Sequence, residues 1–141
     1  MSRYIRANTS QPFAVEKKKI LVVNDEPDVT TMLKMTLERV GFRVDTFNDP
    51  VLALKSYKPH LYDLVILDVI MPELDGLELY TQLKRKDSGI NICFLTASSE
   101  PYREELLKEK YNQLSRDLFL EMPLPTSEII REVKKRMQIP Q

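Results

Sequence analysis

Three side chains that carry oxygen, Asp25, Asp68 and Thr96, each follow or close a short apolar run of the sequence. If these runs are neighbouring parallel strands, the three side chains meet at the sheet edge where such folds bind ligands. Two carboxylates placed together suit Mg²⁺, which takes one or two carboxylates and keeps several waters and a phosphate oxygen. A carboxylate beside the ion can attack phosphorus to form an acyl phosphate, and the Thr96 hydroxyl can donate a hydrogen bond to it. The three residues therefore predict phosphoryl chemistry centred on Asp68.

The loop after the first apolar run is acidic. Residues 24–28 read Asn-Asp-Glu-Pro-Asp, with three acids and no glycine. A nucleotide or flavin phosphate would need a glycine-rich loop whose N–H groups face the anion at a helix N-terminus. This loop would repel a free anion, so it favours a divalent cation that then attracts phosphate. A single acid here is best explained as a helix cap, but capping does not explain Asp25, Asp68 and Thr96 together.

The elements that must position these residues follow from the hydrophobic pattern. From residue 19 onward, short apolar runs alternate with longer segments of helical period, which is typical of βαβ units in a parallel sheet. The expected strands are residues 19–24, 43–48, 63–68, 91–96 and 117–122. Five strands, each followed by a helix, predict an α/β fold: a (βα)5 doubly wound parallel five-stranded sheet of flavodoxin-like order 2-1-3-4-5.

The expected helices have recognisable ends. Pro27 suits the first turn of the first helix, and Gly41 lies just past its end, where a left-handed residue closes a helix. The apolar face of this helix comprises Val29, Met32, Leu33, Leu37 and Val40. The second and third helices begin at Asp49-Pro50 and Asp75-Gly76. The fourth runs from about Ser99 to about Leu114, and the fifth follows Pro125 with Ile129, Ile130, Val133 and Met137 on one face.

The composition describes one globular domain. The 141 residues contain 21 Lys and Arg against 21 Asp and Glu, and this balance does not favour nucleic-acid binding by the domain itself. The single cysteine, Cys93, excludes an intrachain disulfide and is expected to be a buried small hydrophobe. No apolar run reaches the roughly 18 residues that span a bilayer, and the N-terminus lacks a secretory signal. We therefore expect a flexible tail over 1–16, one domain over 17–141, a cytoplasmic location and no membrane contact.

Two stretches of the chain resemble the receiver domain of two-component response regulators, the family that includes the chemotaxis regulator. Residues 67–76, Leu-Asp-Val-Ile-Met-Pro-Glu-Leu-Asp-Gly, are very close to the family's LDxxMPxxDG phosphorylation loop. Residues 19–28, Lys-Ile-Leu-Val-Val-Asn-Asp-Glu-Pro-Asp, are close to its first-strand acidic motif. Thr96-Ala97 and the aromatic Phe119 add to the resemblance, which covers about residues 17–137.

The resemblance implies a phosphorelay signalling role. Asp68 would be the phosphoacceptor, taking a phosphoryl group from a partner histidine kinase or phosphotransfer protein. Asp25 and Asp68 would bind Mg²⁺ together with the backbone carbonyl of Ile70, and Asn24 would act on the ion through a bound water.

The resemblance also implies a switch. Thr96 would close over the phosphoryl group, and Phe119 would change rotamer with it. The output surface would be formed by the fourth helix, the fifth strand and the fifth helix, and its downstream protein partner is unknown.

Two residues depart from the family's pattern. Asn24 stands where the family usually has an acid, and Met122 stands where it has a lysine before the proline. A thioether has no cation to pair with a phosphoryl group. The loss of one carboxylate and one ammonium leaves the net charge of the site unchanged, so we expect metal affinity to survive and phosphoryl stabilisation to suffer more.

A third departure is the segment between Thr96 and Met122, which is longer than the family norm. Residues 114–117, Leu-Ser-Arg-Asp, replace the usual Gly-Ala before the fifth strand. The family's output geometry is therefore expected to transfer poorly.

Three functions compete. The leading interpretation is a stand-alone response regulator receiver that is phosphorylated on Asp68 and signals by protein–protein contacts. The alternative is a pseudo-receiver, an interaction module of the same fold in which phosphorylation is weak or absent, as Asn24 and Met122 suggest. A phosphohydrolase would need a second aspartate as general acid where this chain has Ile70. We therefore expect no enzyme activity beyond slow self-dephosphorylation. His60 lies at the opposite edge of the expected sheet and is interpreted as a surface turn residue.

Overall fold

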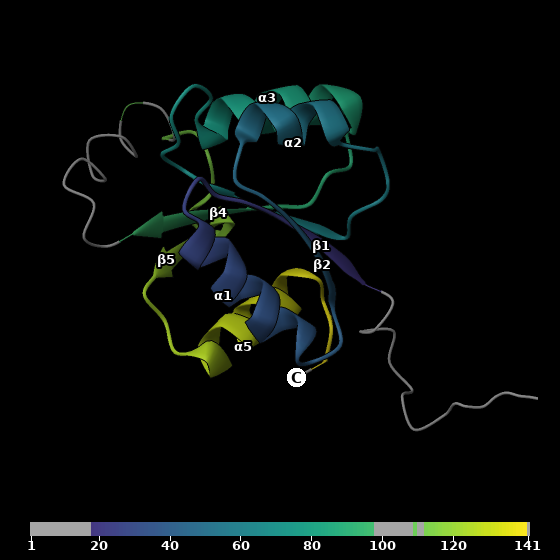
Figure 1. The fold of residues 1–141 in the computed structure, drawn as a ribbon, viewed down its shortest axis with the longest axis vertical. Helices are drawn as coiled ribbons and strands as arrows, with labels where there is room; N and C mark the ends of the chain where they lie inside the picture. The colour runs from purple at the N-terminus through teal and green to yellow at the C-terminus, as the bar shows by residue number, and fades with distance from the viewer. Residues whose placement is uncertain (1–17, 98–108, 110–111, 141) are drawn as a thin grey trace, which may run out of the picture.

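The computed structural model describes residues 18–97, 109 and 112–140. Their centre is a parallel five-stranded sheet of order β2-β1-β3-β4-β5, which confirms the expected fold class and strand order (Figure 1). The strands are β1 (Lys19–Val23), β2 (Arg43–Phe47), β3 (Leu64–Asp68), β4 (Ile92–Ala97) and β5 (Phe119–Met122). Each strand boundary agrees with the sequence-based range to within two residues.

Helices cover both faces of this sheet. α2 (Pro50–Ser56) and α3 (Gly76–Lys86) lie on one face, and α1 (Pro27–Glu38) and α5 (Thr126–Arg136) lie on the other (Figure 1). Side chains alternate along each strand, so Leu21 and Val23 of β1 enter the core beneath α2 and α3, whereas Ile20 and Val22 enter the core beneath α1 and α5. Because both faces are covered, the central strands are continuously apolar.

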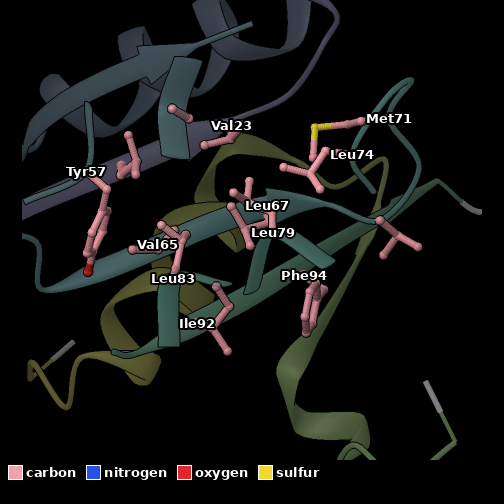
Figure 2. Close-up of a cluster of buried hydrophobic side chains, with 13 residues drawn as sticks. Val23, Tyr57, Val65, Leu67, Met71, Leu74, Leu79, Leu83, Ile92 and Phe94 are labelled. Atoms are coloured by element: carbon pink, nitrogen blue, oxygen red, sulfur yellow. The ribbon is translucent and has the colours of Figure 1, made fainter. Parts of the chain in front are cut away.

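Figure 2 shows the core on the α2/α3 side. Val65 and Leu67 of β3 and Phe94 of β4 pack there against Leu79 and Leu83 of α3. All five side chains are fully buried. This packing fixes the position of β3 along its axis relative to α3. It therefore also fixes where Asp68, the last residue of β3, lies.

The helix ends follow the sequence signals. Pro27 is the first residue of α1, and Gly41 has φ 108°, the left-handed conformation that glycine adopts without strain. The Asp49 carboxylate caps α2 by accepting from the N–H groups of Val51 and Leu52 at 2.9 and 3.3 Å. The Asp75 carboxylate caps α3 by accepting from the N–H of Glu78 at 2.9 Å.

The start of the fifth strand differs from the expectation, and two other expected segments fall largely on residues that the structure does not describe. β5 begins at Phe119 instead of residue 117, because residues 116–118 form a 3₁₀ turn that the Ser115 hydroxyl caps. The expected fourth helix over about 99–114 and the expected tail over 1–16 fall largely or wholly on residues outside the described ranges. Among the helices that are described, none has the length and apolarity required to cross a membrane.

The residues that were assigned structural roles lie as expected. Cys93 is fully buried, and burial raises the pKa of its thiol to about 11. His60 is an exposed turn residue, and its backbone N–H donates to Asp87 at 3.0 Å. Asp87 is the C-cap residue that follows α3, so this contact lies at the edge of the sheet opposite to Asp68.

Candidate functional site

Three neighbouring strands bring the predicted residues to one edge of the sheet. β1, β3 and β4 run parallel, with Val23 opposite Leu67 and Asp68 opposite Leu95. Asp68 is the last residue of β3, Asp25 lies two residues past β1, and Thr96 lies one residue past the partner of Asp68. Residues from three distant parts of the chain therefore meet at the carboxyl ends of the central strands, where doubly wound sheets bind ligands.

The Asp68 carboxylate is half-buried, and its electrostatics show what surrounds it. Burial and the negative charge of Asp25 raise the pKa of Asp68 from its usual 3.8 to about 7, and Glu26 adds to the rise. The backbone N–H groups of Ile70 and Val69 donate to the carboxylate and oppose the shift. The negative charge of Asp25 therefore acts on Asp68, and the two carboxylates repel each other.

The loop after β3 is tied closely to α3. The Gly76 N–H donates to the Val69 carbonyl at 3.0 Å. A Cβ atom on Gly76 would overlap the carbonyl oxygen of Asp68 and lie 3.2 Å from the Cα of Val69. The first residue of α3 thus sits directly against the backbone of Asp68, and this contact requires a glycine.

Asn24 is buried and its side chain shapes the acidic loop. Its Oδ1 accepts from the N–H of Glu26 at 2.9 Å, and its own N–H donates to the Phe47 carbonyl at 3.1 Å. Asp25 is half-buried, and Asp28 is exposed in the first turn of α1. The expected role of Asn24 toward a metal-bound water stays a prediction, as does the metal contact of the Ile70 carbonyl.

The remaining predicted residues lie on β4 and β5. Thr96 is buried and pairs with Glu121 of β5. Phe119 stacks on Phe94, with ring centroids 5.4 Å apart, and Phe94 meets Tyr80 of α3 edge-on at 5.7 Å. Phe119 is thus packed inward against the α2/α3-side core.

Met122, the residue in place of the family's lysine, pairs with Ala97. It is half-buried and packs against the α1/α5-side core. The peptide bond between Met122 and Pro123 is cis. Position 122 therefore brings a thioether, without a cation, to the edge at which Asp68 lies.

The donors present fit a magnesium ion. Carboxylate oxygens are hard ligands, and Mg²⁺ takes one or two of them. None of the ion pairs within residues 18–97 and 112–140 uses Asp25 or Asp68. Across the same part of the chain, no three His, Cys, Asp or Glu side chains gather as a metal cluster. Asp25 and Asp68 are thus two carboxylates whose charges repel each other at this edge, and their role as metal ligands stays a prediction.

Sequence reasoning missed one residue near the site. The side-chain amide of Asn48 donates to the Asn24 carbonyl at 2.8 Å and to the Thr30 hydroxyl at 3.0 Å. The available signal was its position directly after the second strand, at the same edge of the sheet as Asp25 and Asp68. Its partners are 24 and 18 residues away in sequence, so no local pattern reveals them.

Comparisons with known proteins agree with this fold. The family model for the response regulator receiver domain matches residues 20–133. The chain is 38% identical over 117 residues to the alkaline phosphatase synthesis transcriptional regulatory protein PhoP of Bacillus subtilis, a match that covers 83% of this chain and 47% of PhoP. It is 37% identical over 102 residues to the sensor protein EvgS of Escherichia coli, covering 72% of this chain and 8% of EvgS. The chain thus spans about half or less of the length of these relatives.

A solved structure extends the likeness to three dimensions. The response regulator protein TrrA of Thermotoga maritima, solved in complex with Mg²⁺ and BeF, superposes with a TM-score of 0.67 at 31% identity. The superposition covers 84% of this chain and 98% of TrrA. With the family model matched along most of its length and the fold and strand order in agreement, this chain belongs to the response regulator receiver domain family.

Proposed function

We propose that Asp68 accepts a phosphoryl group from a histidine kinase or phosphotransfer protein in a Mg²⁺-dependent reaction, and that the domain signals through protein contacts. The observation that carries this proposal is the Asp68 carboxylate at the end of β3, whose pKa is raised by burial and by Asp25. A divalent cation stabilises two carboxylates that repel each other, because its charge offsets both negative charges. The solved complex of TrrA with Mg²⁺ and BeF supports the assignment by homology.

The proposed transfer uses the residues as follows. An ionised Asp68 oxygen attacks the phosphorus of a phosphohistidine, the new O–P bond forms as the P–N bond breaks, and the departing imidazole nitrogen takes the electron pair and then a proton. The N–H groups of Ile70 and Val69 hold the carboxylate during the attack. When bound, Mg²⁺ supplies charge neutralisation for the transferring group.

The other site residues have supporting roles in this proposal. Asp25, Asp68 and the Ile70 carbonyl would hold the ion, and Asn24 would reach it through a water. The Thr96 hydroxyl would donate to a phosphoryl oxygen, and Phe119 would turn as Thr96 moves. Hydrolysis of the acyl phosphate would be slow, because Ile70 provides no general acid beside Asp68.

The direct test is phosphorylation with a small-molecule donor. Acetyl phosphate and Mg²⁺ should raise the intact mass by about 80 Da, the mass of one phosphoryl group. Asp68→Asn should abolish the gain. Asp49→Asn is the matched control, because asparagine also caps a helix and Asp49 serves only α2 among its described contacts. A parent protein that shows no mass gain at saturating donor would contradict the proposal.

Met122 favours a second candidate, a pseudo-receiver that binds partners with little phosphorylation. Its thioether packs toward the α1/α5-side core and cannot pair with a phosphoryl oxygen. In this case Mg²⁺ would still bind at Asp25 and Asp68, but the mass gain would be absent in the parent protein. The same experiment therefore separates the two candidates when Mg²⁺ binding is measured alongside it.

A further inference from the structure

Asn48 bridges the end of β2 to the acidic loop and to α1. Its Nδ2 donates to the Asn24 carbonyl at 2.8 Å and to the Thr30 hydroxyl oxygen at 3.0 Å. Both hydrogens of the amide are used in these two bonds. A backbone carbonyl only accepts, so the NH₂ group, and not the amide oxygen, must face Asn24.

The bridge belongs to a chain of hydrogen bonds that surrounds Asp25. The Thr30 hydroxyl donates to the Pro27 carbonyl at 3.1 Å, which fixes the first turn of α1. The N–H of Asn24 donates to the Phe47 carbonyl at 3.1 Å, and its side-chain oxygen accepts from the N–H of Glu26 at 2.9 Å. The backbone is thus held on both sides of Asp25, and the end of β2 supplies two of the contacts.

We propose that Asn48 is a positioning residue of the magnesium site, acting through the Asn24 backbone to set the place of the Asp25 carboxylate. This inference rests on the proposed function. Mg²⁺ demands near-ideal octahedral geometry at about 2.0–2.1 Å, so a loop that drifts weakens binding even when both carboxylates remain. Asn24 transmits the effect, because its carbonyl accepts the hydrogen bond from the Asn48 side-chain amide and Asp25 is the next residue in the chain.

The chain contains a matched control for Asn48. The side-chain amide of Asn91 also donates two hydrogen bonds, to the carbonyls of Asp63 at 3.2 Å and Arg136 at 3.1 Å. Asn91 is exposed, as Asn48 is, and it precedes β4, at the sheet edge opposite to Asp68. Asn91→Ala therefore removes the same chemistry from a place where it does not touch the acidic loop.

The first experiment measures Mg²⁺ affinity by calorimetric titration with magnesium chloride. Asn48→Ala should weaken binding roughly tenfold, the effect of losing two ordinary hydrogen bonds. Thr30→Val, which keeps the shape but removes the hydroxyl, should weaken it by about threefold. Asn91→Ala should bind Mg²⁺ within about twofold of the parent. Unchanged affinity in Asn48→Ala, or an equal loss in Asn91→Ala, would overturn the positioning role.

The second experiment needs no metal. In hydrogen exchange followed by NMR, the N–H of Glu26 should exchange several-fold faster in Asn48→Ala than in the parent, because its acceptor Asn24 is released. Asn91→Ala should leave this amide unchanged. Equal exchange in parent and Asn48→Ala would show that the amide does not hold the loop, and would overturn the inference.

The failures of the two proposals are distinguishable. A parent that binds Mg²⁺ but takes no phosphoryl group overturns the proposed phosphoacceptor function and leaves the positioning role intact. A parent that binds no Mg²⁺ overturns both. Urea denaturation of each variant, with an unfolding midpoint close to that of the parent, establishes that a lost affinity comes from a folded protein.

Discussion

At the scale of single residues, the site depends on the environment of the Asp68 carboxylate. Asp68 is half-buried next to Asp25, with two backbone N–H donors and no cationic partner among the ion pairs of the described residues. The ionised Asp68 carboxylate therefore lowers the free energy of unfolding of the domain, a cost that is common for functional residues.

The raised pKa of Asp68 predicts a pH-dependent stability difference. The fold favours the protonated acid, so the stabilisation associated with that form is complete below about pH 4 and is lost as the pH rises through about 7. Asp68→Asn removes the ionisation, so it should raise the free energy of unfolding at pH 8 by on the order of 2 to 4 kcal/mol. Near pH 4 the two proteins should be alike.

Urea denaturation in metal-free buffer at several pH values measures this difference. Asp49→Asn serves as the control, since it replaces one aspartate by an asparagine at an exposed cap. If the difference in the free energy of unfolding between the parent and Asp68→Asn stayed constant from pH 4 to pH 8, this would argue against a raised pKa of Asp68.

Met122 gives a second prediction at this scale. Met122→Lys restores a cation at the end of β5, and a charge-assisted contact to a phosphoryl group is commonly worth about 1.5–3 kcal/mol. Phosphorylation by acetyl phosphate should therefore accelerate by roughly tenfold to a hundredfold. The measurement is the rate of mass gain.

Met35→Lys is the control for Met122→Lys, because Met35 is 59% exposed on α1 and a lysine there is simply solvated. If the parent were phosphorylated efficiently and Met122→Lys were phosphorylated no faster, the proposed effect of replacing the family's lysine by Met122 would be wrong.

At the scale of elements, the site is set by the contact between the end of β3 and the start of α3. Gly76 donates to Val69 and lies against the Asp68 carbonyl. The Asp75 cap fixes the same helix start. The orientation of the Asp68 backbone is thus determined by where α3 begins.

Gly76→Ala should break this contact. The added methyl overlaps backbone atoms, which cannot rotate away as a side chain can, so the end of β3 or the start of α3 must shift. We expect a loss of about 1–3 kcal/mol in the free energy of unfolding, against the small gain that alanine normally gives in a helix. Phosphorylation of Asp68 should slow as well.

Gly89→Ala is the matched control, because a Cβ there meets nothing within 4 Å. Denaturation and the rate of mass gain are measured for both variants. If Gly76→Ala were as stable and as reactive as Gly89→Ala, the close approach would have no role in placing Asp68.

At the scale of the whole molecule, two cores on opposite faces of one sheet carry the site at their shared edge. Any ligand that binds the folded edge and not the unfolded chain stabilises the whole domain. Under the proposed function, Asp25 and Asp68 would have to be ionised to bind Mg²⁺, so this linkage would depend on pH.

We therefore expect Mg²⁺ to raise the free energy of unfolding by about 1.4 kcal/mol when its free concentration is about ten times Kd. Affinity should fall by about tenfold per pH unit below about pH 7, where Asp68 takes up a proton. Thermal unfolding at fixed Mg²⁺ should thus show a larger increase in Tm at pH 8 than at pH 6. An equal increase at both pH values, or one retained in Asp68→Asn, would place the ion elsewhere.

The sequence by itself determined the elements and the edge at which the chemistry lies. Alternating apolar runs predicted the five strands and their order, and Asp49 and Asp75 marked two helix starts that the structure confirms. These features depend on neighbours in the chain and on a small set of allowed topologies, so local patterns suffice to predict them.

Tertiary structure alone decided the contacts that tune the site. The bridge from Asn48 to Asn24 exists because β2 lies beside β1, and the glycine at position 76 matters because α3 starts against the end of β3. The pKa of Asp68 depends on its burial and on Asp25, which is distant in sequence. Distances between residues far apart in the chain follow from packing, and no spacing in the sequence encodes them.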